Sequence, residues 1–179
     1  IYMNSDSIIS SVFVKPDRIV LGRKLGEGDF GEVRLGTLLP TGPGKEQEVA
    51  VKMIKGGAIA DGHRKAFESE MEVMAQLRHT YVLTTLAVVP EPLMIAMERA
   101  TTNVKEYIID NGYCSENPLP WPVVLMWIHH TAAGMRYLAD HNVIHRDVAA
   151  RNMLLQVESR TNFTVKVSDF GLSKVVAQQ

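Results

Sequence analysis

The most informative stretch of this sequence reads Gly26-Glu27-Gly28-Asp29-Phe30-Gly31-Glu32-Val33. The run before it, residues 19–25, is apolar and β-branched at its start, and residues 32–35 alternate in polarity, which is typical of strands. A dinucleotide-binding fold needs a helix directly after such a glycine motif. Strands on both sides instead predict a flap whose backbone N–H groups cover phosphates. A plain glycine-rich hairpin is the alternative that this motif alone leaves open.

Composition describes an ordinary globular chain of 179 residues, 46% hydrophobic and 22% charged, with a formal net charge of -1. This charge balance argues against a dedicated nucleic-acid binder. No apolar run is long enough for a transmembrane helix, and the single cysteine, Cys114, cannot form an internal disulfide. We therefore expect a cytoplasmic protein, with attachment to the inner face of the plasma membrane left open through regions outside this sequence.

The first third of the chain predicts a three-stranded antiparallel meander, since the turn-rich residues 39–44 are followed by the strand-like residues 49–53. Residues 61–78 then change to a helical period that places Glu70 in the middle of the apolar face. A buried carboxylate needs a cation. Lys52, at the end of the neighbouring strand, is either a solvated edge residue or that cation, and a Lys–Glu pair would hold the ammonium group against nucleotide phosphates.

Sheet signals continue and then give way to helical ones. Residues 81–89 and 93–97 are strand-like, and residues 98–103 form a polar connector. Residues 121–139 predict a helix with one stripe of Val124, Trp127, Thr131, Met135 and Leu138. Residues 153–155 and 165–167 predict a short hairpin around a polar turn. Strands first and helices second indicate an α+β fold with two lobes.

Two further motifs carry chemistry. The first reads His145-Arg146-Asp147-Val148-Ala149-Ala150-Arg151-Asn152, in which Asp147 can orient a hydroxyl nucleophile and Asn152 offers a neutral oxygen to a metal ion. The second is Asp169-Phe170-Gly171, whose carboxylate would complete the coordination of Mg²⁺. Hard oxygen ligands together with substrate phosphates are what Mg²⁺ prefers.

In this order and spacing, the four elements resemble the eukaryotic protein kinases from about residue 18 to residue 174. The resemblance implies a protein-kinase-like bilobal fold that binds ATP, with Mg²⁺ or alternatively Mn²⁺, between its lobes. It divides the chain into a flexible lead-in (1–17), a complete β-rich N-lobe with one helix (18–98), a hinge (99–103) and a partial helical C-lobe (104–179). Because family C-lobe segments beyond Gln179 are missing, we expect this chain to be a fragment and a poor catalyst by itself.

The resemblance also implies a role for each matched residue. Lys52 would contact the α and β phosphates, Glu70 would be its partner, and Asp147 would be the catalytic base. Met97 would be the gatekeeper before the hinge, and Ala100 would offer backbone groups to adenine. The other implied nucleotide contacts lie in the glycine motif and around the adenine ring: Leu25, Gly26, Glu27, Gly28, Asp29, Phe30, Gly31, Val33, Ala50, Glu98 and Leu154.

The run Ala149-Ala150-Arg151 resembles the tyrosine kinases, in which Arg151 can reach the reacting oxygen of a tyrosine substrate. Within that group, residues 93–98 and 169–174 look like the cytoplasmic spleen tyrosine kinase family, so we expect a non-receptor protein-tyrosine kinase. Thr85 departs from the family, which usually has a bulky apolar residue there. Tyr2-Met3-Asn4 resembles a phosphotyrosine docking sequence for SH2 domains. The alternative function is a pseudokinase or nucleotide-binding scaffold without phosphoryl transfer.

Overall fold

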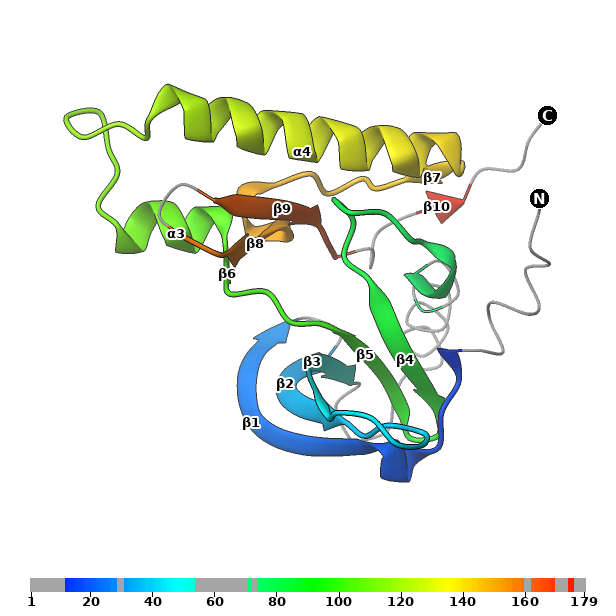
Figure 1. Cartoon of the computed structure of the whole chain (residues 1–179). Helices are drawn as coiled ribbons and strands as arrows, with labels where there is room; N and C mark the ends of the chain where they lie inside the picture. Colours follow the sequence, from blue (N-terminus) through cyan, green and yellow to red (C-terminus); the bar gives the residue numbers. More distant parts are fainter. Residues whose placement is uncertain are drawn as a thin grey trace. The chain divides into compact units, whose positions relative to one another are not determined.

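Figure 1 shows the chain as a computed structural model, which describes residues 12–28, 31–53, 71, 74–159, 162–169 and 174–175. The chain forms two compact units. The first contains Ile1–Leu77 and Thr84–Arg99, and the second contains Arg78–Leu83 and Ala100–Gln179. The short segment Arg78–Leu83 therefore packs apart from its neighbours in sequence, and the chain returns to the first unit at Thr84.

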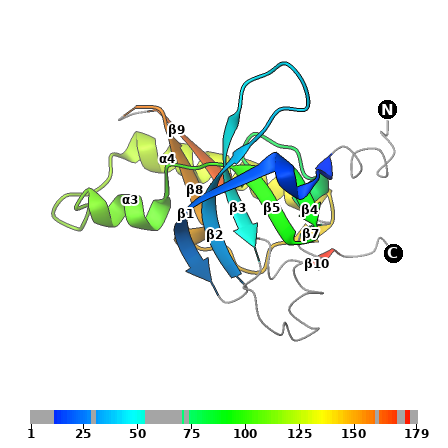
Figure 2. The same cartoon turned by 90° about the horizontal axis from the view of Figure 1, so that it is seen from below.

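The first unit is built around a five-stranded antiparallel sheet with the strand order β1-β2-β3-β5-β4. Its strands are β1 (Ile19–Gly28), β2 (Gly31–Leu38), β3 (Gln47–Met53), β4 (Thr85–Pro90) and β5 (Leu93–Glu98). The predicted meander is confirmed as β1, β2 and β3. The turn-rich residues between β2 and β3 extend as a long loop beyond the strands (Figure 2).

One face of this sheet carries a hydrophobic core. In β3, Val49 and Val51 are both 0% exposed, while the alternate residues Ala50 and Lys52 are half-buried on the opposite face. The buried core residues come from four of the five strands: Ile19, Val49, Val51, Ala87, Val89, Met94 and Ala96. The two-residue period of β3 therefore separates its core face from the face that carries Lys52.

The start of the described chain also packs on this sheet. Val12 is 5% exposed, Phe13 forms a bridge with Val88 of β4, and the Val14 N–H donates to the Val88 carbonyl at 2.9 Å. A short 3-10 turn, η1 (Pro16–Arg18), leads into β1. The sequence predicts a flexible lead-in over residues 1–17, whereas residues 12–14 pack on the sheet, with Val12 buried, Val14 half-buried and Phe13 37% exposed.

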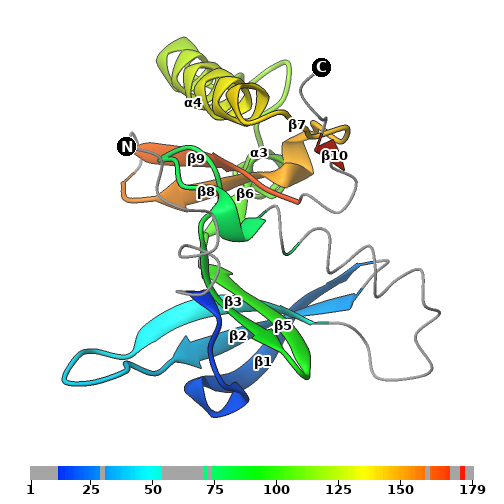
Figure 3. The ribbon, with the colours of Figure 1, turned by 90° about the vertical axis from the view of Figure 1, so that its right-hand side faces the viewer.

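The second unit combines short strands with two helices. β6 (Thr102–Asn103), β8 (Met153–Val157) and β9 (Phe163–Val167) form one sheet, and β7 (Val143–Ile144) pairs with β10 (Lys174–Val175). The helices are α3 (Val104–Asp110) and α4 (Trp121–Asp140), and α4 lies along one side of the β8–β9 hairpin (Figure 3). A 3-10 turn, η2 (Ala150–Asn152), precedes β8. The predicted long helix and the predicted hairpin are both confirmed.

The buried stripe of α4 differs from the prediction at its edges. Trp127 and Leu138 are buried as expected, but the other buried positions are Val123 and Gly134, while the predicted Val124, Thr131 and Met135 are half-buried. A Cβ atom on Gly134 would lie 2.5 Å from the Tyr81 carbonyl oxygen and 2.9 Å from Val167 Cγ2. The absence of a side chain there lets α4 approach both backbone segments, which an apolar pattern cannot reveal.

Three more features differ from the sequence-based expectation or lie outside the described residues. α3 is not predicted, because seven residues with three charges give almost no periodic signal. Residues 81–84 do not extend β4, since Val82 forms an isolated bridge with Val167 of β9. Most of the predicted helix over residues 61–78, including Glu70, lies outside the described residues. Within the described ranges, no helix is long and apolar enough to cross a membrane.

Candidate active site

In the first unit, the predicted nucleotide-contact residues share one face of the sheet. Lys52 pairs with Val33 of β2, and Ala50 pairs with Met97 of β5. Residues paired directly across antiparallel strands point to the same side, so these four lie together on the face opposite the core. Val33, Ala50 and Lys52 are half-buried and Met97 is 6% exposed. The structure thus brings together a basic group and a set of small or flexible apolar ones.

The glycine motif forms the end of the β1–β2 hairpin. Gly26 pairs with Val33, and Gly28 pairs with Gly31, so a strand follows the motif as predicted. The residues at its tip, Asp29 and Phe30, lie outside the described residues. A register shift between Lys24 and Gly26 leaves Leu25 in an irregular part of β1, where it is 39% exposed. Glu27 is exposed and forms an ion pair with Lys24.

In the second unit, the side chains of Arg151 and Asn152 meet around the carboxylate of Asp147. One guanidinium nitrogen of Arg151, Nη2, lies 2.7 Å and 2.9 Å from the two carboxylate oxygens of Asp147. Asn152 Nδ2 donates to Asp147 Oδ2 at 2.9 Å and to the Asp147 carbonyl at 2.9 Å. Hydrogen bonds from Asn152 and then from Arg151 lower the pKa of Asp147 below its ordinary value. At neutral pH, Asp147 is therefore a carboxylate that is held in one position and can accept a proton.

A buried histidine and a buried serine hold this loop to the end of β9. His145 is 1% exposed, and its Nδ1 accepts the Asp147 backbone N–H at 3.2 Å. Its Nε2 therefore carries the proton and donates to the Ser168 carbonyl at 2.9 Å. Ser168 in turn donates both its N–H and its hydroxyl to the Asn152 carbonyl, each at 2.9 Å. With both ring nitrogens committed to backbone groups, His145 has a structural role.

The backbone is strained at two residues beside this cluster. Arg146 and Asp169 both have a φ of 65°, a left-handed conformation that costs non-glycine residues about 1–3 kcal/mol. Asp169 directly follows Ser168, which is bonded to Asn152. Such strain persists where the surrounding contacts over-determine the backbone, and it concentrates at functional sites. Here the strain occurs at Arg146, directly before Asp147, and at Asp169, which is predicted to bind metal.

The donor set fits a hard divalent cation. Asn152 is 4% exposed and uses Nδ2 for both of its side-chain hydrogen bonds, so among the described residues its Oδ1 oxygen is not engaged. That leaves a fixed, neutral oxygen on the side chain that holds the Asp147 carboxylate, and Asp169 directly follows Ser168, which is bonded to the Asn152 backbone. Oxygen donors of this kind suit Mg²⁺ when phosphate oxygens complete the set.

The remaining predicted site residues differ in their burial and contacts. Glu98 is half-buried and its carboxylate accepts the Thr84 N–H at 2.7 Å, so its side chain supports the β4–β5 pair. Ala100 and Leu154 are half-buried residues of the second unit. Glu70 lies outside the described residues, so its predicted pairing with Lys52 stays a prediction. The sequence reasoning missed Ser168, for which the only signal was its place directly before Asp169.

Comparison with known proteins agrees with these motifs. The profile of the family described as "Protein tyrosine and serine/threonine kinase" matches residues 19–179. Tyrosine-protein kinase Shark of Drosophila melanogaster is 35% identical over 170 residues, which are 90% of this chain and 17% of that protein. Tyrosine-protein kinase SRK2 of Spongilla lacustris is 37% identical over 165 residues, 91% of this chain and 41% of that protein.

A third relative is a receptor: Ephrin type-B receptor 5 of Gallus gallus is 37% identical over 164 residues, 90% of this chain and 15% of the receptor. The chain thus spans less than half the length of each of these three relatives. The residues that the family profile matches nevertheless include the glycine hairpin, the strand that carries Lys52, and the Asp147 loop. This chain belongs to the protein tyrosine and serine/threonine kinase family.

Proposed function

We propose that this chain forms part of the catalytic domain of a protein-tyrosine kinase, which transfers the γ-phosphoryl group of ATP to tyrosine hydroxyls of proteins. The observation that carries the proposal is the cluster in which Arg151 and Asn152 both hold the carboxylate of Asp147. The run Ala149-Ala150-Arg151 resembles the tyrosine kinases. The relatives named tyrosine kinases also support this specificity.

In the proposed reaction, the phenol oxygen of the substrate forms a bond to the γ-phosphorus, and the bond from that phosphorus to the β–γ bridging oxygen breaks. Asp147 accepts the phenol proton, and ADP leaves with the electron pair of the broken bond. Asn152 and Arg151 keep the carboxylate oriented, which matters because catalysis of phosphoryl transfer is mostly positioning and charge stabilisation. Arg151 would exchange part of its contact with Asp147 for the substrate oxygen.

The phosphates require groups from several positions. In this proposal, Lys52 and the backbone of the glycine hairpin bind the ATP phosphates, with Glu70 as the partner of Lys52. Asn152 and Asp169 would hold Mg²⁺, or Mn²⁺ in its place. When bound, the cation neutralises charge on the phosphate oxygens. Val33, Ala50, Met97, Ala100 and Leu154 would surround the adenine, and residues 99–103 would act as the hinge.

We further propose that the parent protein is a non-receptor, cytoplasmic kinase similar to the spleen tyrosine kinase family. Residues 93–98, with Met97 before the hinge, support this subfamily. In that case, a phosphorylated Tyr2 is a candidate ligand for SH2 domains. The sequence of the complete transcript tests this assignment, since a membrane-spanning segment upstream of Ile1 would contradict it.

Phosphorylation of a mixed peptide library by the natural protein that carries these residues tests the main proposal. We expect phosphate to be incorporated on tyrosine. The variant Asp147→Asn removes the general base, and a loss of this kind typically lowers the rate by about 10²–10⁴-fold. The matched control is Asp140→Asn, which removes an exposed carboxylate at the end of α4 and should leave the rate unchanged. Labelling of serine and threonine alone would refute tyrosine specificity. Nucleotide binding without any transfer would favour the pseudokinase alternative.

A further inference from the structure

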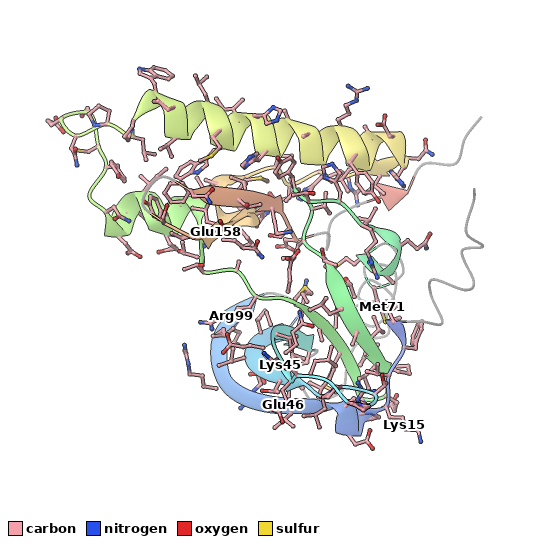
Figure 4. All side chains as sticks on the ribbon, in the orientation of Figure 1. Lys15, Lys45, Glu46, Met71, Arg99 and Glu158 are labelled. Carbon is pink, nitrogen blue, oxygen red and sulfur yellow. The ribbon has the colours of Figure 1, made fainter. Side chains whose placement is uncertain are left out.

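Histidine and tyrosine rings pack the segment Arg78–Leu83 against α4, and the proposed phosphoryl transfer assigns no role to them. Tyr81 of the segment stacks on His130 of α4, with ring centroids 4.2 Å apart and an angle of 16° between the ring planes. The ring of His79 meets Tyr81 edge-on at 5.6 Å. Figure 4 shows side chains of α4 directed toward this segment and toward β9. The segment therefore contacts the helix through rings that include titratable imidazoles.

The backbone of the same segment holds the end of β9. The Tyr81 carbonyl accepts the Val167 N–H, and the Leu83 N–H donates to the Val167 carbonyl, each at 2.9 Å. Val167 adjoins Ser168, which donates twice to the Asn152 carbonyl. The Asn152 side chain in turn donates to the carboxylate of the proposed general base. A continuous path of contacts thus runs from an imidazole of α4 to that carboxylate.

The hydrogen bond of His130 determines which form of its imidazole fits this packing. His130 Nδ1 accepts the Val165 N–H at 3.4 Å, so the neutral ring carries its proton on Nε2. A second proton would lie on Nδ1, where it would face the Val165 N–H and remove this bond. The ring is also half-buried, and burial disfavours the charged form. The packing therefore suits the neutral imidazole and opposes the imidazolium.

The titratable and charged groups around this ring provide no opposing charge. On α4 itself, the ring centroid of His129 lies 5.9 Å from that of His130. The segment contributes Tyr81, and β9 contributes Lys166, whose ammonium group donates to the Thr80 carbonyl at 2.9 Å. Among the residues that the structure describes, no carboxylate forms an ion pair with His130. Desolvation, and then the charge of His129, accordingly lower the pKa of His130 from its ordinary value of 6.5.

We propose that His130 and Tyr81 are positioning residues that hold the end of β9, and with it the loop of Asp147, only while the imidazole of His130 is neutral. Acidification protonates His130, weakens its packing on Tyr81 and loosens the two hydrogen bonds of Val167. The loop that carries the proposed general base then loses part of its anchorage. Only the effect on phosphoryl transfer rests on the proposed function; the anchorage of β9 does not.

Hydrogen exchange of the Val167 amide, measured on the 179-residue chain from about pH 7.5 to about pH 5, tests the anchorage. After correction for intrinsic exchange, its protection should fall about tenfold for each pH unit between the open-state and folded-state pKa values of His130. The internal control is the Val157 amide, which donates to Thr101 Oγ1 at 3.2 Å. It lies beside Glu158 at the other end of the hairpin (Figure 4), and its protection should stay constant.

Three variants separate the titration from the packing. His130→Phe keeps a ring beside Tyr81 but cannot take up a proton, so the acid-induced loss of Val167 protection should disappear. His129→Gln removes the neighbouring charge and should move this loss to higher pH. The matched control is His141→Gln, which replaces an exposed histidine directly after α4 that packs on the Tyr137 ring. It should leave the pH dependence unchanged.

An NMR titration of the His130 ring measures its pKa directly. A value above 6.5 would overturn the proposal, because cation–π attraction to Tyr81 would then stabilise the imidazolium. Persistence of the acid-induced loss in His130→Phe, or an equal loss at the Val157 amide, would also overturn it.

The natural protein that carries these residues tests the effect on phosphoryl transfer. Its turnover should fall over the same pH range, and His130→Phe should remove this part of the pH profile without changing KM for ATP. Turnover that stays constant while Val167 loses protection would refute the positioning role. Loss of Val167 protection in a protein that transfers no phosphate at any pH would confirm the anchorage and refute the proposed function alone.

Discussion

Replacing Gly134 of α4 with alanine has two opposing effects on stability, a gain in helix propensity and a steric clash. Alanine is more favourable than glycine in a helix interior by about 1 kcal/mol, so helix propensity alone predicts stabilisation. However, the new Cβ would lie 2.5 Å from the Tyr81 carbonyl oxygen, which is a backbone atom and cannot rotate away. That same carbonyl accepts the Val167 N–H at 2.9 Å. Relief therefore requires α4 to move or this hydrogen bond to weaken.

The steric term is the larger one. Overpacking a well-packed interior costs about 1–3 kcal/mol, and a weakened buried hydrogen bond adds about 1 kcal/mol. After the gain in propensity is subtracted, we expect Gly134→Ala to lower the free energy of unfolding by about 1–3 kcal/mol. The loss should be concentrated where α4 meets Tyr81 and Val167, both of which belong to the second unit.

Urea denaturation followed by circular dichroism measures this change, and hydrogen exchange of the Val167 amide reports its location. The matched control is Ala132→Gly, an exposed position on the same helix, which should cost only the propensity difference of about 1 kcal/mol and leave the Val167 amide protected. If propensity governed both sites, the two variants would change stability in opposite directions. A higher urea midpoint for Gly134→Ala would therefore refute the close approach of α4.

Three further outcomes are expected. Thr85→Val should raise the free energy of unfolding by about 1–2 kcal/mol, because Thr85 is 1% exposed and its hydroxyl has no hydrogen-bond partner among the described residues; destabilisation would show that the hydroxyl is satisfied. Asn152→Ala and Arg151→Ala should each raise the pKa of Asp147, measured by carboxyl-carbon NMR titration, because each removes a hydrogen bond to the carboxylate; an unchanged pKa in either variant would contradict that contact. Desolvation, with a smaller effect of the neighbouring imidazole, lowers the pKa of His130 from 6.5. Its neutral form is thus favoured by folding, so stability should be complete above pH 6.5 and should decrease as the pH falls through the folded-state pKa. In His130→Phe this part of the pH dependence should disappear, and an unchanged pH profile of unfolding would count against it.

What the sequence predicts well is what short-range patterns determine. β3 is recognisable because Val49 and Val51 alternate with Ala50 and Lys52, and its burial follows that alternation. α4 is recognisable because twenty residues give its apolar period room to show. α3 has only seven residues, and its start depends on the Asn103 side chain accepting the Glu106 N–H at 2.9 Å. A single cap of this kind is too weak a signal to identify a helix without its tertiary setting.

The same division runs through the candidate active site. Asp147, Arg151 and Asn152 are four and five positions apart, so their meeting can be predicted from one motif. The contacts that immobilise them are long-range, since Ser168 reaches Asn152 and His145 from the end of β9. The adjoining residue of β9, Val167, is held by Tyr81, whose carbonyl faces Gly134. The side-chain cluster of residues 145–152 can therefore be predicted from the sequence of that loop alone. The rigidity of the loop, in contrast, depends on Gly134 of α4, which belongs to no catalytic motif.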